Sequence, residues 1–221
     1  MANGMRFGLF VLILMAGFAL CECQTPPSTH VDAPVSPKKS PTVELLRNGD
    51  FSSGNAEFES GYAYSETSIV PTGTYSITSN PALIHPSATA MVDHTTGTGL
   101  MGVWNGSTVA DIVAWQETVS VVPNTSYLFS GWISTFDKSG TFNQFDIDIH
   151  PADLRFVING TEVGTFSLVG PAEDGAWGQF KFVWISGSAA TATIQIFIVR
   201  TDDSGNDVAI DDLSFIGPYY R

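Results

Sequence analysis

The sequence predicts an all-β domain, a two-sheet antiparallel β-sandwich of the jelly-roll type. From residue 43 onward apolar and polar residues alternate with a period of two, and turn signals recur about every ten residues. No stretch keeps the helical period of 3.6 for the ~12 residues that a helix needs. The 221 residues include 21 Gly and 12 Pro, which favours a turn-rich β protein. No repeat of 20–50 residues is visible, which argues against a propeller or solenoid.

The N-terminal segment resembles a secretory signal peptide. Arg6 precedes an apolar run from Phe7 to Leu20, and these 14 residues are fewer than the ~20 that a membrane span needs. We therefore expect a signal peptide over residues 1–23, a secreted or extracellular protein and no transmembrane segment in the mature chain. Lipid attachment at Cys21 is an alternative. Both cysteines, Cys21 and Cys23, lie in this segment, so we expect no disulfide in the folded domain.

Residues 24–42 form a proline-rich linker. Five prolines stand here among small polar residues, a composition typical of an extended polyproline-type tether. A disordered extension is the simpler interpretation of the same composition. The jelly-roll domain is predicted over residues 43–221.

The predicted strands follow one another along this domain. Segment 125–135 carries apolar side chains on both faces, which indicates a strand covered on both sides. In segment 142–150 apolar residues alternate with Asp146 and Asp148, as in a half-buried strand with an acidic outer face. Within segment 153–168 the dipeptide Asn159-Gly160 predicts a type I′ hairpin. Further strands are predicted at residues 177–185, 191–200 and 208–217.

The charge composition excludes several classes of function. The chain has 9 Lys and Arg against 22 Asp and Glu, a formal net charge of -13. An acidic surface repels phosphate backbones, so nucleic acid and anionic lipid are not expected partners. Hydrophobic residues make up 43% and aromatic residues 12%, which excludes a disordered acidic tail.

Four aspartates stand beside predicted strand ends and are candidate metal ligands. Asp50 follows the start of the first strand, Asp93 lies mid-chain, and Asp211 and Asp212 lie in the last strand. In a sandwich the first and last strands commonly lie side by side, so Asp50 and Asp211 can meet despite their separation in the sequence. Calcium, which takes six to eight oxygen ligands, would offset their repulsion. The alternative is that Asp50 and Asp93 form turns and Asp211 lies at a solvated rim.

Alternation along the last strand places Asp211 on the same face as Ala209, Leu213 and Phe215. This face is expected to point toward the core, with Asp212 outward. A carboxylate that faces a core is costly unless it is paired or metal-bound, which makes Asp211 the stronger candidate.

Three stretches resemble the signature stretches of MAM-type extracellular jelly rolls and of related bacterial modules with the galactose-binding-like fold, carbohydrate-binding modules included. They are NGDFSSGNAEFESGY, DHTTGTGLM and GNDVAIDDLSF. The resemblance covers residues 44–217 and implies a jelly roll with a structural calcium. When the ligand positions of these families are carried over to this chain, the implied calcium ligands are Asp50, Asp93 and Asp211, with Asp212 as a further candidate.

The chain departs from the MAM pattern in two respects. It lacks the disulfide cysteines of animal MAM domains, and Ser52 stands where they usually have Glu. The second departure weakens the first metal ligand, so that Asp50 would contribute only a backbone oxygen, or Glu57 or Glu59 would take its place.

Exposed aromatic rings are the candidate contacts for a sugar. Trp104 precedes the turn-like Asn105-Gly106, and Tyr62 and Tyr64 lie near a predicted loop. We therefore expect Trp104, Tyr62 and Tyr64 to form a ligand-binding platform. A loop aromatic that merely caps the end of the sandwich is the alternative.

No catalytic motif stands out, because no cysteine nucleophile and no HExxH spacing is present. We expect no enzymatic activity, but a secreted, calcium-stabilised, non-catalytic module that binds carbohydrate or mediates extracellular adhesion. One alternative is a structural surface or matrix protein with protein partners. Another is a carbohydrate-active enzyme that uses Asp146 and Asp148.

Overall fold

The computed structural model describes residues 40–136, 152–167, 176–201 and 205–220. Residues 39–221 belong to one compact unit. Several predictions fall outside the described residues: the signal peptide, lipidation at Cys21, nearly all of the linker, and the strand with Asp146 and Asp148. Among the residues that the structure describes, none forms a helix with the length and apolar character that a membrane crossing requires.

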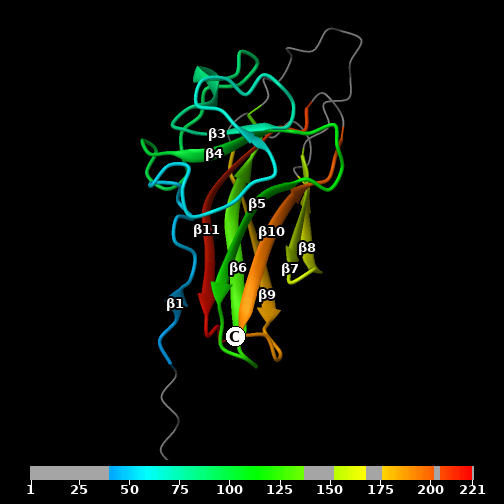
Figure 1. Ribbon diagram of the computed structural model, residues 1–221. Helices are drawn as coiled ribbons and strands as arrows, with labels where there is room; N and C mark the ends of the chain where they lie inside the picture. The colour runs from blue at the N-terminus through cyan, green and yellow to red at the C-terminus, as the bar shows by residue number, and fades with distance from the viewer. Residues whose placement is uncertain (1–39, 137–151, 168–175, 202–204, 221) are drawn as a thin grey trace, which may run out of the picture. The chain divides into compact units, whose positions relative to one another are not determined.

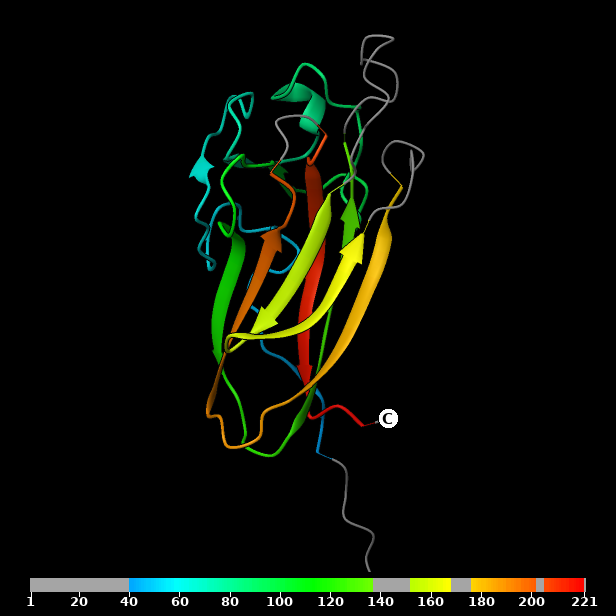
Figure 2. The same ribbon diagram turned by 90° about the vertical axis from the view of Figure 1, so that its right-hand side faces the viewer.

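Two sheets form the domain, which confirms the predicted β-sandwich (Figures 1 and 2). The larger sheet has the order β2-β3-β4-β11-β6-β9, and β1 pairs with β11. Its strands are β1 (Val43–Glu44), β2 (Ala63–Tyr64), β3 (Thr74–Thr78), β4 (Met101–Asn105), β6 (Ser126–Ser134), β9 (Gly178–Ile185) and β11 (Val208–Gly217).

The smaller sheet has the order β5-β10-β7-β8. Its strands are β5 (Val113–Ser120), β7 (Asp153–Ile158), β8 (Thr161–Ser167) and β10 (Thr191–Ile198). A short 3-10 helix, η1 (Pro81–Leu83), lies between β3 and β4. Successive strands from β4 to β7 and from β8 to β11 alternate between the two sheets, as they do when a chain wraps around a sandwich.

Two local predictions are confirmed. The β7–β8 hairpin closes with Ile158 opposite Thr161, and Asn159 and Gly160 have φ values of 50° and 75°, as a type I′ turn requires. The first and last strands are neighbours, since Val43 pairs with Gly217. This pairing places the segment that follows β1 against β11.

The larger sheet is covered on both faces near β4 and β11. Trp104 belongs to the core between the sheets, whereas its neighbour Val103 belongs to a second apolar cluster. Side chains from residues 69–91, Ile84 and Met91 among them, cover that second cluster from outside. Because both faces of β4 are covered, no side chain of this strand is left exposed.

A β-bulge in β11 determines where the two adjacent aspartates point. The pairing with β6 shifts between Asp211 and Ser214, and Asp212 has a φ of 47°. Ala209 lies in the outer cluster, whereas Leu213 lies in the core between the sheets. Asp211 is therefore buried, as predicted, but on the outer side of the sheet with Ala209. The predicted shared face with Leu213 is wrong, because the bulge interrupts the alternation.

Candidate functional site

The four aspartates proposed as metal ligands lie around the loop of residues 93–99, which we call the acidic loop. His94 of this loop donates its backbone N–H to Asp211 Oδ2 over 2.8 Å. Asp50 and Asp93 line the same small cavity, and Asp50 and Asp212 line a neighbouring hollow. The structure therefore brings together side chains more than 150 positions apart in the sequence.

Asp93 organises the acidic loop. Its Oδ2 accepts the Thr96 N–H at 2.7 Å and the Thr96 hydroxyl at 3.1 Å, and its Oδ1 accepts the Gly99 N–H. Burial works to raise the pKa of Asp93, but these hydrogen bonds outweigh it and lower the pKa below its ordinary value. Gly97, with a φ of +76°, makes the sharp turn of the loop.

Asp211 is fully buried under the acidic loop, with 0% exposure. Desolvation raises its pKa to about 6, although N–H groups of Asp212 and His94 oppose the shift. Its Oδ2 also receives the N–H and hydroxyl of Thr95. Asp212 is bound by the Thr95 hydroxyl at 2.7 Å and by His94 Nδ1, and the His94 ring stacks on Trp132 at 3.9 Å.

These contacts limit how a cation could be held. In the part of the chain that the structure describes, no three Asp, Glu, His or Cys side chains form a group that could hold a metal ion. Both oxygens of Asp211 and of Asp212 already have partners. Both oxygens of Asp93 are occupied as well, by N–H groups of Thr96 and Gly99, whereas among the described residues only Oδ1 of Asp50 accepts hydrogen bonds, from Ser52. Asp50 is therefore the better candidate to bind a cation, in a cavity of about 150 Å³ that Asp93 also lines.

Two of the three aromatic side chains expected at the surface are buried. Trp104 is 0% exposed and stacks on Tyr75 inside the core between the sheets. Tyr62 is 5% exposed, and burial raises its pKa to about 12 against the opposing effect of a Ser107 backbone hydrogen bond. The expected exposure is therefore wrong for both rings. Tyr64, at 39%, does present its ring to solvent.

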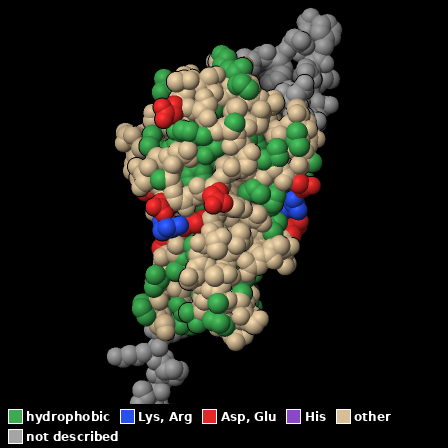
Figure 3. Space-filling model, viewed as in Figure 1, with side chains coloured by type: hydrophobic (Ala, Val, Ile, Leu, Met, Phe, Trp, Pro, Cys, Tyr) green, Lys and Arg blue, Asp and Glu red, His purple; other side chains and the backbone are tan. Residues whose placement is uncertain are grey.

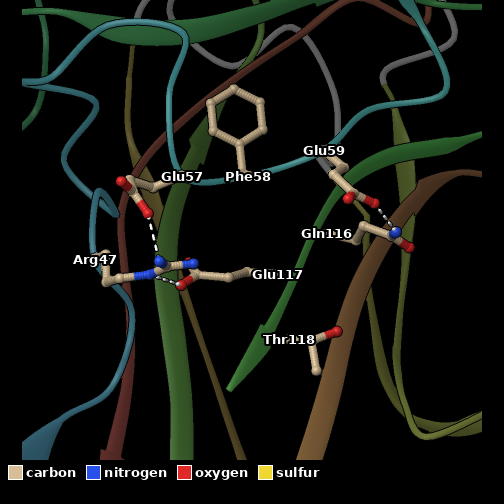
Figure 4. A pocket seen from close by; sticks show the side chains of 7 residues that line it. All are labelled: Arg47, Glu57, Phe58, Glu59, Gln116, Glu117 and Thr118. Atoms are coloured by element: carbon tan, nitrogen blue, oxygen red, sulfur yellow. Dashed lines mark hydrogen bonds and ion pairs between the residues drawn. The ribbon is translucent and has the colours of Figure 1, made fainter.

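A groove of mixed charge lies beside β5, and we call it the β5 groove (Figure 4). It has a volume of about 350 Å³. The loop of residues 47–59 forms one side of it and β5 the other. It is lined by Arg47, Glu57, Phe58, Glu59, Gln116, Glu117 and Thr118.

The loop that forms this groove is held by its first residues. Asn48 is buried, accepts the Ser53 N–H at 2.9 Å and donates to the Gly54 and Ala56 carbonyl oxygens. A side chain at Gly49 would meet the Leu213 carbonyl oxygen at 1.8 Å, so only glycine permits this approach to β11. The Asn-Gly dipeptide thus explains how the loop turns from β1 toward β5.

One end of the groove carries an ion-pair network. Arg47 contacts Glu57 at 2.6 Å and Glu117 at 3.1 Å. Glu117 lies on β5 between the buried Trp115 and Val119, and its side chain is 3% exposed. Desolvation raises the pKa of Glu117, and the hydrogen bond from Arg47 opposes the rise. The exposed Arg47 thus partly offsets the charge of a buried carboxylate.

The other end carries a chain of amide and carboxylate hydrogen bonds. The backbones of Glu59 and Gln116 exchange two hydrogen bonds of 2.9 Å. The Gln116 side-chain amide donates to Glu59 Oε2 at 2.7 Å and accepts from Gln195 of β10 at 3.0 Å. Figure 4 shows this pair and the Arg47 network on the two sides of the view, with the Phe58 ring projecting away from both. The lining of the groove therefore contains both hydrogen-bond donors and acceptors.

Sequence reasoning named Glu57 and Glu59 only as substitute metal ligands and missed the groove. Two signals point to it. Glu117 is a charged residue at an inward position of a strand, and such a residue requires a partner. Arg47 is the only Lys or Arg between Lys39 and Lys138, which makes it the available cation in that stretch.

No protein-family model and no curated protein matches this sequence. The resemblance to MAM-type modules therefore gains no support from a family match. Among solved structures, an apo-form cyclase from Fischerella sp. is similar with a TM-score of 0.55 and 10% identity, over 81% of this chain and 98% of that chain. A Stig cyclase from Fischerella sp. TAU, solved with an indole compound, gives 0.53 and 10%, over 80% and 98%. At such identities these structures show a shared fold alone.

Sugar-binding proteins also occur among the similar structures. A family 16 carbohydrate-binding module gives a TM-score of 0.42 at 16% identity, over 77% of this chain and 98% of that chain. This likeness is too low to carry an argument about function.

The cyclases correct one expectation. We expected a domain without enzymatic activity because no catalytic motif stands out. Solved structures that share its fold are cyclases, and one of them holds a bound indole compound. The fold and the lack of a familiar motif are therefore no ground for excluding catalysis.

Proposed function

We propose that this domain binds a carbohydrate in the β5 groove. The observation that carries the proposal is the lining of the groove. Six hydrogen-bonding side chains line, together with Phe58, a hollow of about 350 Å³. This volume falls within the ~300–1,000 Å³ typical of small-molecule sites.

The lining suits neighbouring hydroxyl groups. A sugar hydroxyl both donates and accepts, and the groove offers carboxylate acceptors at Glu57 and Glu59, a guanidinium donor at Arg47 and an amide at Gln116 that does both. The Phe58 ring packs on Phe51, Tyr75 and Trp115 of the core, and the exposed part of this half-buried residue supplies a small apolar surface for the C–H groups of a sugar ring.

The groove continues past Glu59 and Gln116. A second hollow of about 330 Å³ shares these two residues and is lined further by Gly61, Ile112 and Val113. Two adjoining hollows with common polar residues suit neighbouring units of an oligosaccharide better than a single sugar.

A binding assay with matched variants tests this function. We expect glycan-array hits, followed by titration calorimetry, to show affinity that Gln116→Ala lowers about tenfold, on the order of one lost pair of hydrogen bonds. Gln179→Ala, an exposed glutamine on β9 in the other sheet, is the control and should bind like the wild type. Absence of glycan binding by a folded wild-type domain would contradict the proposal and favour a surface protein with protein partners.

We also propose that calcium binds in the cavity between Asp50 and Asp93 and stabilises the acidic loop. The support is the lining: Asp50 and Asp93 line the cavity with Ser52, Thr95 and Thr96, no basic side chain does, and only Oδ1 of Asp50 accepts hydrogen bonds among the described residues. We expect calcium to raise the melting temperature of the wild type and not that of Asp50→Asn, which changes a half-buried residue outside the core. An equal melting temperature with calcium and with chelator would contradict the site.

We also propose secretion and extracellular action, supported by Arg6 and the apolar run from Phe7 to Leu20 that follows it. Mass spectrometry of the protein exported from its host tests them. We expect a mature chain without residues 1–23, and an intact N-terminus on the exported protein would contradict cleavage there.

A further inference from the structure

The β5 groove carries more negative than positive charge. Three carboxylates, of Glu57, Glu59 and Glu117, line it together with the single guanidinium of Arg47. Arg47 is engaged by Glu57 and by Glu117. At neutral pH these four formal charges sum to an excess of two negative charges in the lining.

Glu59 is the carboxylate that Arg47 does not reach. Its side-chain partner is the neutral amide of Gln116, and among the described residues no basic side chain pairs with it. The residue is exposed and lines both hollows of the groove. Figure 4 shows its carboxylate on the far side of Phe58 from the guanidinium. A ligand in the groove thus meets an uncompensated negative charge at the junction of the two hollows.

The surroundings strengthen this charge. The whole chain has a formal net charge of -13, and Figure 3 shows that basic side chains on this face lie beside acidic ones. A field of this sign attracts cations and repels anions before contact is made. Carboxylate-bearing sugars would meet repulsion both at long range and at Glu59.

We propose that the β5 groove selects a glycan that carries protonated amino groups, such as an oligomer of glucosamine, with Glu59 receiving the ammonium group. This inference rests on the proposed carbohydrate binding and names its substrate class. The hydroxyls of the sugar add hydrogen bonds at Gln116 and Thr118, whose side chains also bond to protein neighbours, and the ammonium supplies the cation that Glu59 lacks. The side chains of a lysine-rich peptide would pair with Glu59 as well, but their methylene groups would add no hydrogen bonds at Gln116 and Thr118.

Titration calorimetry at mildly acidic pH, where the sugar amines are protonated, tests the inference with four probes: glucosamine trimer, N-acetylglucosamine trimer, galacturonic acid trimer and tetralysine. We expect the glucosamine trimer to bind about tenfold more tightly than its acetylated form, the effect of one charge-assisted hydrogen bond. Glu59→Gln should abolish this difference and leave the acetylated trimer bound as before. Glu162→Gln, an exposed glutamate on β8, is the control and should keep the difference.

The outcomes separate the two proposals. Equal affinity for both glucosamine forms would overturn the amino-sugar preference and leave carbohydrate binding intact. Tetralysine binding as tight as that of the glucosamine trimer would overturn it in favour of a general cation site. If none of the three sugars binds, the amino-sugar preference is wrong. If a glycan array also gives no hits, the proposed carbohydrate binding is wrong as well.

Discussion

The acidic loop and the β5 groove both gather carboxylates, but they use them in opposite ways. Around the acidic loop the oxygens of Asp93 and Asp211 accept backbone N–H groups of the loop itself. In the β5 groove Glu57 and Glu59 pair through side chains at the surface. A carboxylate whose oxygens are filled by backbone donors holds a loop in place, whereas one held only by another side chain remains available to a ligand.

The largest expected difference between the two regions is in pH dependence. The pKa of Asp211 rises from its ordinary 3.8 to about 6 in the folded protein. Folding therefore favours the protonated form, so the stability from this group is fully present below pH 3.8 and is lost as the pH rises through about 6. With solvent screening we expect a loss of about 2 to 3 kcal/mol.

Urea unfolding between pH 4 and 7, with chelator present, measures this loss. Asp211→Asn should make the profile shallower, because the raised pKa of Glu117 still contributes a slope of the same sign, and Glu59→Gln should leave the profile as in the wild type. If the free energy of unfolding of Asp211→Asn depended on pH as steeply as that of the wild type, the buried carboxylate would not control this pH dependence.

The next effect concerns truncation of one carboxylate in each region. Asp93→Ala leaves the N–H groups of Thr96 and Gly99 without their acceptor, and we expect it to lower the free energy of unfolding by about 2 kcal/mol. Glu59→Ala at the exposed groove should change it by no more than about 0.5 kcal/mol. If urea unfolding showed the same loss of free energy of unfolding for Asp93→Ala and Glu59→Ala, the two carboxylates would not differ in their structural role.

The smallest expected effect is that of Tyr64→Ala on glycan binding. Tyr64 is the one ring of the predicted platform that reaches solvent, but it does not line the β5 groove. We expect its affinity for glycan, measured by calorimetry, to equal that of the wild type. A loss as large as that of Gln116→Ala would move the binding site to the exposed aromatic ring.

The sequence predicted those features that depend on neighbouring residues. The Asn159-Gly160 hairpin and the period-two strands follow from local turn chemistry and alternation. The approach of the segment around Asp50 to β11 followed from the general adjacency of first and last strands, whereas the grouping of Asp93 with Asp211 came from the resemblance to MAM-type modules.

The features that the sequence did not predict depend on contacts between segments far apart along the chain. Trp104 is buried because its strand is covered on both faces, which the residues MGVWN do not reveal. Because of the bulge at Asp212, Asp211 lies on the outer side of the sheet instead of sharing the core face with Leu213. The ion pair between Arg47 and Glu117 joins residues 70 positions apart, so only the fold brings them together.

Nuclear magnetic resonance titration of the labelled domain is the strictest test of carbohydrate binding beside β5. With a glycan identified by array, we predict that the backbone amide signals of Glu59 and Gln116 shift progressively, while those of His94 and Thr95 in the acidic loop do not. Shifts confined to the acidic loop, or to Tyr64, would contradict the claim.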